Sequence, residues 1–199
     1  MLIMKTESSC VRQHIIDTAK PIILGKGYAA VGLSEILSAA DVPKGSFYHY
    51  FKSKDAFGEA LLEHYFDEYL AQLDALMAED GTPAAERLMR YWQSWGHHQL
   101  CDNKESKCLV VKLGGEVCDL SEAMRETLNR GTDAIIHRLA GCIEAGRDDG
   151  SLTDIDDARA TAETLYQMWL GATLLSKIRR DDVPLAAALQ ATRQLLQLA

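Results

Sequence analysis

The spacing of hydrophobic positions predicts helices along almost the whole chain of 199 residues. Apolar residues recur every three or four positions, which is the period of a helix with one buried face, and no segment alternates as a half-buried strand does. We therefore predict an all-α fold of about nine helices. The expected helices are 10–26, 33–40, 44–50, 54–79, 84–101, a segment from 108 onward, 121–148, 156–180 and 184–198.

Two of these helices contain residues that disfavour regular helix. Pro21 lies inside the first one, where proline removes a backbone hydrogen bond at a cost of roughly 3 kcal/mol, so we expect a kink. Gly114 and Gly115 follow one another in the segment from 108, and we expect them to interrupt it. Gly32 and Ser53 stand at the cap positions of the helices that follow them.

The composition is that of an ordinary globular protein, with 47% hydrophobic and 25% charged residues. No apolar run approaches the roughly 18 residues of a membrane span, and the first residues lack the apolar region of a signal peptide. The five cysteines are an odd number at scattered positions, which does not suggest a disulfide framework. We expect a reduced, soluble, cytoplasmic protein.

The net charge of −8 at first argues against a nucleic-acid partner, but its distribution does not. Residues 1–54 carry seven Lys and Arg against four acids, a charge of +3. Residues 55–199 carry 14 bases and 25 acids, a charge of −11. A basic head on an acidic body favours DNA at one end of the chain and repels it elsewhere.

The predicted helix 156–180 is apolar on more than one side. One stripe contains Leu165, Trp169 and Ala172, and a second contains Leu170 and Leu174. A helix that is apolar all round must be buried on both faces. It is either the central core helix or part of a dimer interface. We favour a homodimer formed through the last two helices, 156–180 and 184–198.

Residues 33–52 form a helix, a three-residue turn (Asp41-Val42-Pro43) and a second helix, the arrangement that lays a helix in the major groove of DNA. Lys44 and Ser46 begin the second helix, where the helix dipole favours phosphate. It also presents three polar aromatic side chains, Tyr48, His49 and Tyr50, and Lys54 follows as a further cation. The alternative is that the two helices only cap a helical bundle.

The stretch Val-Pro-Lys-Gly-Ser-Phe-Tyr-His-Tyr-Phe-Lys-Ser-Lys, residues 42–54, strongly resembles the recognition helix of the tetracycline-repressor (TetR) family. The resemblance implies a homodimer that binds a palindromic operator through residues 1–53, while residues 54–199 bind an inducer and dimerise, with helix 54–79 linking the two. Asp41 departs from the family's usual glycine. The resemblance implies DNA contacts by eight residues. Lys44, Tyr48, Tyr50 and Lys54 would touch DNA together with Ser34, Gly45, Ser46 and His49, the last four being better placed for base edges.

Cys108 is the cysteine with the most cationic setting in the sequence. If Ser106 caps the helix, Cys108 lies in its first turn, where the dipole lowers a thiol pKa, and Lys107 and Lys112 add positive charge. These features favour the nucleophilic thiolate. The alternative is that Cys108 is a small buried apolar residue, as free cysteines usually are.

The stretch from Cys108 to Ser121, with Trp169 to Ile178, resembles the electrophile-responsive repressors of the NemR type. That resemblance implies that electrophiles or oxidants modify Cys108 and that Lys177 approaches it as a charge partner. A regulator that senses a small noncovalent ligand is the main alternative, and aromatic residues, Tyr91, Trp92, Trp95, Tyr166 and Trp169, are candidates to line its pocket.

Two further classes fit the sequence less well. A cysteine-nucleophile enzyme would use His97 or His98 as the base for Cys108, but no motif surrounds these histidines. A zinc site built from them with Cys101 and Cys108 matches no standard ligand spacing. We therefore expect a DNA-binding regulator that is not an enzyme and carries no metal or cofactor.

Overall fold

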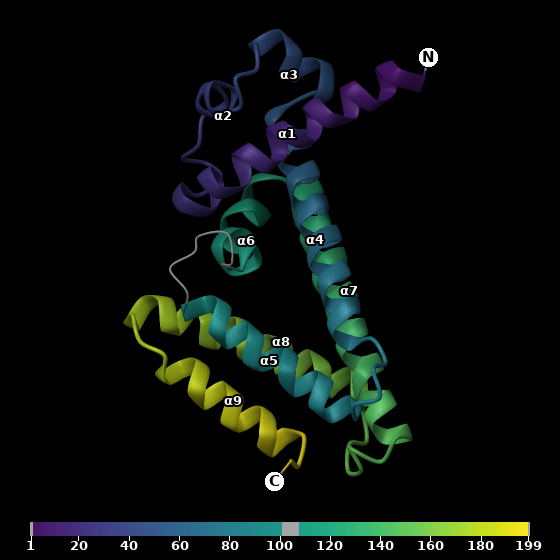
Figure 1. Cartoon of the computed structure of the whole chain (residues 1–199). Coiled ribbons are helices and arrows are strands. Elements are labelled where there is room, and N and C mark those ends of the chain that lie inside the picture. The colour runs from purple at the N-terminus through teal and green to yellow at the C-terminus, as the bar shows by residue number, and fades with distance from the viewer. Residues whose placement is uncertain (1, 101–107, 199) are drawn as a thin grey trace. The chain divides into compact units, whose positions relative to one another are not determined.

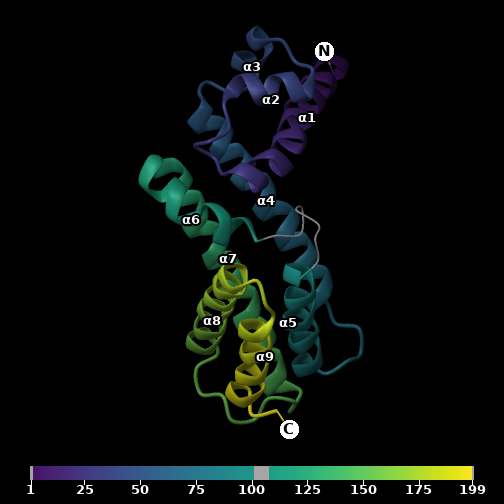
Figure 2. The ribbon, with the colours of Figure 1, turned by 90° about the vertical axis from the view of Figure 1, so that its left-hand side faces the viewer.

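The computed structural model describes residues 2–100 and 108–198, with side chains described for 10–99 and 108–198. All regular structure in this part of the chain is α-helix, which confirms the predicted all-α class (Figure 1 and Figure 2). The described residues form nine helices. Their bounds are α1 Leu2–Lys26, α2 Leu33–Ala40, α3 Lys44–Tyr50, α4 Lys54–Met77, α5 Ala84–Leu100, α6 Leu109–Leu120, α7 Glu122–Asp148, α8 Ala158–Arg179 and α9 Val183–Leu195.

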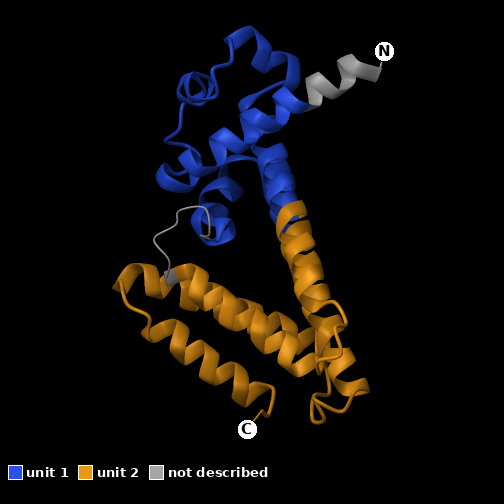
Figure 3. Ribbon diagram, viewed as in Figure 1, with its two compact units in different colours: residues 1–66, 103–129 blue, residues 67–102, 130–199 orange. Residues whose placement is uncertain are grey.

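The chain divides into two compact units (Figure 3). The first comprises residues 1–66 and 103–129 and holds α1, α2, α3, α6, the first half of α4 and the start of α7. The second comprises residues 67–102 and 130–199 and holds α5, α8, α9 and the remainder of α4 and α7. The predicted functional division between residues 53 and 54 concerns DNA binding and regulation and stays a prediction.

The core of the first unit forms where α1, α2 and α3 pack together. Ile15, Ile16 and Ile36 have no exposed surface, and neither does Phe47, the one buried residue of α3. The Phe47 ring lies against the rings of Phe51 and Phe57, with centroids 5.1 and 5.7 Å away. Burying these apolar side chains fixes the two short helices, which are too short to be stable alone.

The helices that contain the proline and the paired glycines are continuous in this structure. Helix α1 continues through Pro21 and begins well before residue 10, and the kink expected at Pro21 stays a prediction. Helix α6 runs unbroken through Gly114 and Gly115, so the prediction of an interruption is wrong. The buried residues of α6 share one face, and their burial outweighs the roughly 1 kcal/mol by which each glycine disfavours helix. These residues are Leu109, Leu113 and Val117.

The core of the second unit is an aromatic cluster between α5, α8 and α9. The rings of Trp92 and Trp169 are stacked, with centroids 5.1 Å apart and planes 16° apart. The indole N–H of Trp169 donates to Thr192 on α9 at 2.9 Å, and that of Trp95 donates to Thr173 on α8 at 2.9 Å. Two tryptophans thus hold the helices together through both ring packing and a hydrogen bond.

Candidate DNA-binding helices and candidate sensor cysteine

Helices α2 and α3 have the boundaries that the sequence predicts for the helix-turn-helix. Gly32 stands at the N-cap of α2, and Asp41 closes it in the left-handed conformation, with φ 53° and its N–H bonded to the carbonyl of Leu37. Aspartate adopts this conformation at a modest cost because its short polar side chain tolerates it. Pro43 sets the start of α3. The turn therefore forms without the glycine that the family motif usually has.

The residues predicted to contact DNA all lie outside the core of the first unit. Ser34 lies on α2, Lys54 begins α4, and the others lie on α3 (Figure 1). Tyr48 is the most clear-cut case, because 53% of a large aromatic side chain is exposed. Four more positions are also exposed: Ser34, Lys44, Gly45 and His49. The remaining three, Ser46, Tyr50 and Lys54, are half-buried. The individual contacts with DNA stay predictions.

Tyr28, in the turn after α1, holds Lys54 in place. The ammonium of Lys54 donates to the Tyr28 carbonyl at 3.0 Å and lies 4.7 Å from the centre of the Tyr28 ring. In return the Tyr28 hydroxyl donates to the Lys54 carbonyl. Burial, with the nearby Asp55 carboxylate second, raises the pKa of Tyr28, so the hydroxyl keeps its proton. The cation at the start of α4 is thus positioned by the turn that follows α1.

One basic residue of the head has its charge satisfied within the chain. The ammonium of Lys26, at the end of α1, lies 2.5 Å from the Glu35 carboxylate on α2. Both side chains are exposed, so the pair contributes little to stability. The pair neutralises one of the seven basic side chains of residues 1–54.

Helix α6 contacts the turn after α1 through two charged side chains. The Glu116 carboxylate accepts the backbone N–H groups of Tyr28, at 3.2 Å, and of Ala29. The Lys112 ammonium lies 3.5 Å from the carbonyl oxygen of Gly25. These residues are 87 or 88 positions apart in the sequence, and no local pattern could have predicted the contact.

Cys108 is buried at the N-cap of α6, with 8% of its surface exposed. Burial raises the pKa of its thiol. The N–H groups of Val111 and Val110 and the side chain of Tyr65, on α4, act on the pKa in the opposite direction. The expectation of a lowered pKa is wrong for this conformation, because loss of water around a thiolate outweighs the helix N-terminus.

The residues predicted to act with Cys108 lie in different parts of the chain. Ser106 and Lys107 lie outside the described residues. Lys112 directs its ammonium to the Gly25 carbonyl. Lys177 is an exposed residue of α8, in the second unit, and its approach to Cys108 stays a prediction.

The other cysteines differ from Cys108 in their surroundings. Cys10 is exposed, Cys118 is half-buried, and Cys142 is buried with its pKa raised to about 11, mainly by burial. Cys101 lies outside the described residues. Where side chains are described, no group of three or more His, Cys, Asp or Glu is placed to hold a metal ion. His97 and His98 are exposed at the end of α5.

The aromatic residues considered for an inducer pocket pack against one another in the core of the second unit. Tyr91, Trp95 and Tyr166 surround the stacked Trp92 and Trp169, and all five are buried. The indole N–H of Trp92 is buried and has no hydrogen-bond partner. The arrangement is that of close packing, which is the default for large aromatic side chains.

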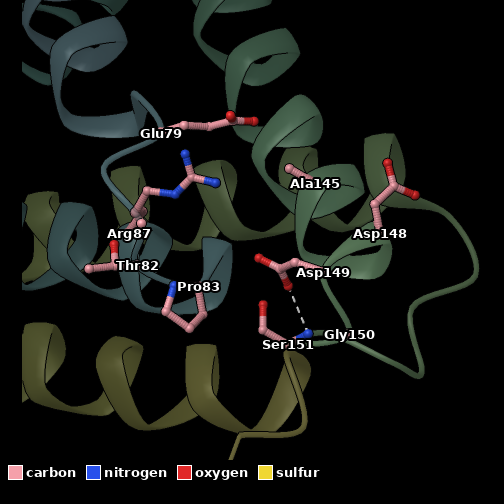
Figure 4. Close-up of a pocket in the computed structure, with 10 residues that line it drawn as sticks. Glu79, Thr82, Pro83, Arg87, Ala145, Asp148, Asp149, Gly150 and Ser151 are labelled. Atoms are coloured by element: carbon pink, nitrogen blue, oxygen red, sulfur yellow. Dashed lines mark hydrogen bonds between the residues drawn. The ribbon is translucent and has the colours of Figure 1, made fainter.

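A surface pocket of about 640 Å³ lies elsewhere in the second unit, between the start of α5 and the end of α7 (Figure 4). Arg87 is buried at its edge and donates to the carbonyl of Met77 at 2.7 Å. Glu79, Asp148 and Asp149 also line it, so the pocket carries more negative than positive charge. None of the predicted site residues lines it.

Comparison with known proteins identifies the family. A family profile described as "Bacterial regulatory proteins, tetR family" matches residues 15–61, and one described as "Tetracyclin repressor-like, C-terminal domain" matches residues 84–192. The HTH-type transcriptional repressor NemR of Escherichia coli K12 is 40% identical over 186 residues, which is 93% of both chains. The chain belongs to the TetR family.

Further TetR-family regulators resemble the chain along most of its length. The transcriptional regulator AcuR of Cereibacter sphaeroides is 34% identical over 90% of this chain and 82% of its own. The crystal structure of E. coli NemR in its reduced form matches with a TM-score of 0.88, at 40% identity, over 92% of this chain and 95% of that one. The predicted recognition of the family, with its likeness to NemR, is confirmed.

TetR-type regulators bind DNA operators and dimerise, and the homologues found are transcriptional regulators. Helices α8 and α9 leave large apolar side chains exposed in the single chain. They include Leu174, Leu175 and Ile178 on α8 and Val183 and Leu195 on α9. Among the described helices, none is both long and apolar enough to cross a membrane.

Proposed function

We propose that this TetR-family regulator is a repressor that leaves a palindromic operator when an electrophile or oxidant modifies Cys108. Residues 1–53 bind DNA, residues 54–199 regulate and dimerise, and α4 links the two. The observation that carries the proposal is the place of the thiol, buried at the N-cap of α6 next to the side chain of Tyr65 on α4. Repression follows the likeness to the E. coli transcriptional repressor NemR, and a redox response is suggested by the likeness to the structure of NemR in its reduced form.

The chemistry with a maleimide is a simple addition. The thiolate sulfur of Cys108 forms a bond to one carbon of the ring's double bond, and the other carbon takes the proton that the thiol lost. No group leaves and no co-reactant is needed. Because the thiol is 8% exposed, the adduct does not fit between α6 and Tyr65 as they stand, and the start of α6 must move away from α4.

Release of DNA follows from geometry in this proposal. A dimeric helix-turn-helix protein places its two recognition helices about 34–36 Å apart, in successive major grooves. A change of a few ångströms in that spacing loses the second half-site. The dimer forms through α8 and α9, whose exposed apolar side chains a second copy would cover.

A noncovalent sensor is the second candidate, and one observation favours it. Burial raises the pKa of Cys108, which lowers the population of reactive thiolate in this conformation. In that case a small ligand replaces covalent modification, and Cys108 is only a packed core residue. Its inducer then acts equally on wild type and on Cys108→Ser.

A DNA mobility-shift assay at fixed salt tests both candidates, using the fragment upstream of this protein's own gene. Cys10 is exposed on α1, so Cys10→Ser is the reference protein and Cys10→Ser/Cys108→Ser is the test protein. We expect N-ethylmaleimide to release DNA from the first and not from the second. Cys10→Ser/Cys142→Ser is the matched control, because it also removes a buried thiol, and it should behave as the reference does.

Each other result has a definite meaning. Release from the protein without Cys108 contradicts the sensor assignment. DNA binding that N-ethylmaleimide leaves unchanged in all three proteins retains the regulator and points to a noncovalent ligand. If none of the three proteins binds this fragment or other candidate operator fragments at low salt, the DNA-binding function is contradicted.

A further inference from the structure

Glu116 joins α6 to the DNA-binding head by accepting two backbone hydrogen bonds at once. Its two carboxylate oxygens accept the N–H groups of Tyr28 and Ala29, the residues that lead from α1 to α2. Hydrogen bonds to an ionised acceptor are about twice as strong as those between neutral groups. Within the turn, the N–H of Gly27 donates to the Ile23 carbonyl and that of Val31 to the Tyr28 carbonyl, so Glu116 supplies the acceptors for the two N–H groups that follow Gly27.

The neighbouring residues fit this contact closely. Lys112, one helical turn before Glu116, places its ammonium by the Gly25 carbonyl, where the negative end of the α1 dipole favours a cation. Gly27 has φ 95°, and a Cβ there would lie 3.1 Å from a Glu116 oxygen. A side chain at this position would therefore crowd the carboxylate, so glycine serves both the turn and the contact.

The contact continues from the turn into the DNA-binding residues. Tyr28, whose N–H Glu116 accepts, also holds both the ammonium and the carbonyl of Lys54. Lys54 begins α4 and is one of the residues expected to touch DNA. A displacement of the Tyr28 backbone therefore moves a DNA contact as well as the start of α2.

The contact also continues back to Cys108. Cys108 is the N-cap of α6, and Glu116 lies eight residues further along the same unbroken helix, about 12 Å away. The buried residues of α6 hold it as one body, since they lie on a single face. Cys108, α6, Glu116, Tyr28 and Lys54 all belong to the first unit (Figure 3).

We propose that Glu116 is the positioning residue through which modification of Cys108 reaches the DNA-binding helices. This inference rests on the proposed function and adds a route to it. When an adduct on Cys108 moves the start of α6 away from Tyr65, the helix carries Glu116 with it. The N–H groups of Tyr28 and Ala29 then lose their acceptor, and the turn that places α2 and Lys54 loosens.

The test compares Glu116→Ala with Asp119→Ala, both in the Cys10→Ser background. Asp119 is an exposed acid on the same helix and serves as the matched control. Glu116→Gln is a second variant, which keeps the size of the side chain and removes its charge. Two quantities are measured before and after N-ethylmaleimide: the operator Kd, and the amide exchange rates of Tyr28 and Ala29. Mass spectrometry confirms that Cys108 reacts equally in all proteins.

In the reference protein and in Asp119→Ala, we expect modification to raise the operator Kd by about 5- to 150-fold, the usual range of coupling between sites. It should also speed exchange at Tyr28 and Ala29 about tenfold or more, as loss of a hydrogen bond to a charged acceptor predicts. In Glu116→Ala, exchange should be fast in both states and the ratio of the two Kd values should fall close to one. Glu116→Gln should lie between.

The proposal is overturned if Glu116→Ala keeps the full Kd ratio, or if modification leaves exchange at Tyr28 and Ala29 of the reference protein unchanged. Should operator affinity of the reference protein not respond to modification at all, the proposed electrophile response fails. The exchange rates still decide the coupling in that case, because they do not depend on DNA.

Discussion

Gly58 lies where the start of α4 packs against Tyr28, and it has no room for a larger residue. A Cβ at this position would lie 2.5 Å from the Met124 sulfur and 2.6 Å from the Tyr28 hydroxyl oxygen. Both neighbours are buried, Met124 completely and Tyr28 to 97%. The Gly58→Ala variant must therefore displace the Tyr28 ring, and with it the hydrogen bond from Tyr28 to the Lys54 carbonyl.

The size of the effect follows from three contributions. Alanine stabilises a helix by about 1 kcal/mol relative to glycine. Overpacking in a buried site costs about 1–3 kcal/mol, and loss of the Tyr28 hydrogen bond costs about 1 kcal/mol. We expect Gly58→Ala to lower the free energy of unfolding by about 1–3 kcal/mol. Gly141→Ala is the control, because Gly141 is an exposed position in α7 with no neighbour within 4 Å. It should raise stability by about 1 kcal/mol.

Thermal unfolding at one protein concentration measures the comparison. A difference of about 2–4 kcal/mol between the two variants corresponds to roughly 5–15 °C in Tm for a chain of this length. Gly58→Ala should also weaken operator binding, since the displaced Tyr28 no longer positions Lys54. If Gly58→Ala proves as stable as Gly141→Ala, the packing argument and the role given to Tyr28 are both refuted.

Three further expectations follow from the structure. Because burial raises the pKa of Cys108, its rate of reaction with N-ethylmaleimide should still increase with pH above the ordinary thiol pKa of about 8.5; mass spectrometry of the Cys108 peptide checks this, and a plateau at lower pH contradicts it. Trp169→Phe should cost about 1 kcal/mol more than Trp92→Phe in urea unfolding, because the indole N–H of Trp169 donates to Thr192 whereas that of Trp92 has no acceptor; equal losses would show that this hydrogen bond contributes nothing. Hydrogen bonds from the Ser151 hydroxyl and from the backbone N–H of Ala84 lower the pKa of the Asp149 carboxyl. The contribution of these bonds to the free energy of unfolding is therefore present at neutral pH and is lost as pH falls through the lowered pKa. Asp149→Asn should therefore lower Tm at pH 7 and converge with wild type in acid, and a constant difference in Tm across pH would rule out this role.

The candidate DNA-binding helices could be predicted from the sequence because their boundaries depend on local signals. Gly32 and Pro43 stand at the start of α2 and α3, and Ser53 caps α4 by accepting the N–H of Ala56. Each signal acts within a few residues of the helix end that it sets. For the same reason, the predicted bounds of α2 and α3 agree with the structure to the residue.

The features that could not be predicted depend on burial and on distant parts of the chain. Gly114 and Gly115 favour a break locally, but the buried face of α6 outweighs them. The lowered pKa expected for Cys108 considered only the residues next to it, whereas the structure buries the thiol against Tyr65. The contact of Glu116 with the turn after α1 joins residues 88 positions apart. Periodicity and composition carry no information about such pairs.

The ion pair between Lys26 and Glu35 has a consequence for how the protein responds to ionic strength. Each lysine that neutralises a DNA phosphate releases a condensed counterion, and the number released sets how steeply affinity falls as salt rises. Lys26 already has its counter-charge on the neighbouring helix and releases none. Lys44, Lys52 and Lys54 remain close to the recognition helix, about six cations in a dimer, for which log Kobs should change with log salt with a slope of about −5. The acidic remainder of the chain repels DNA of any sequence, so affinity depends on the few cations near the recognition helices and on their fit to the operator.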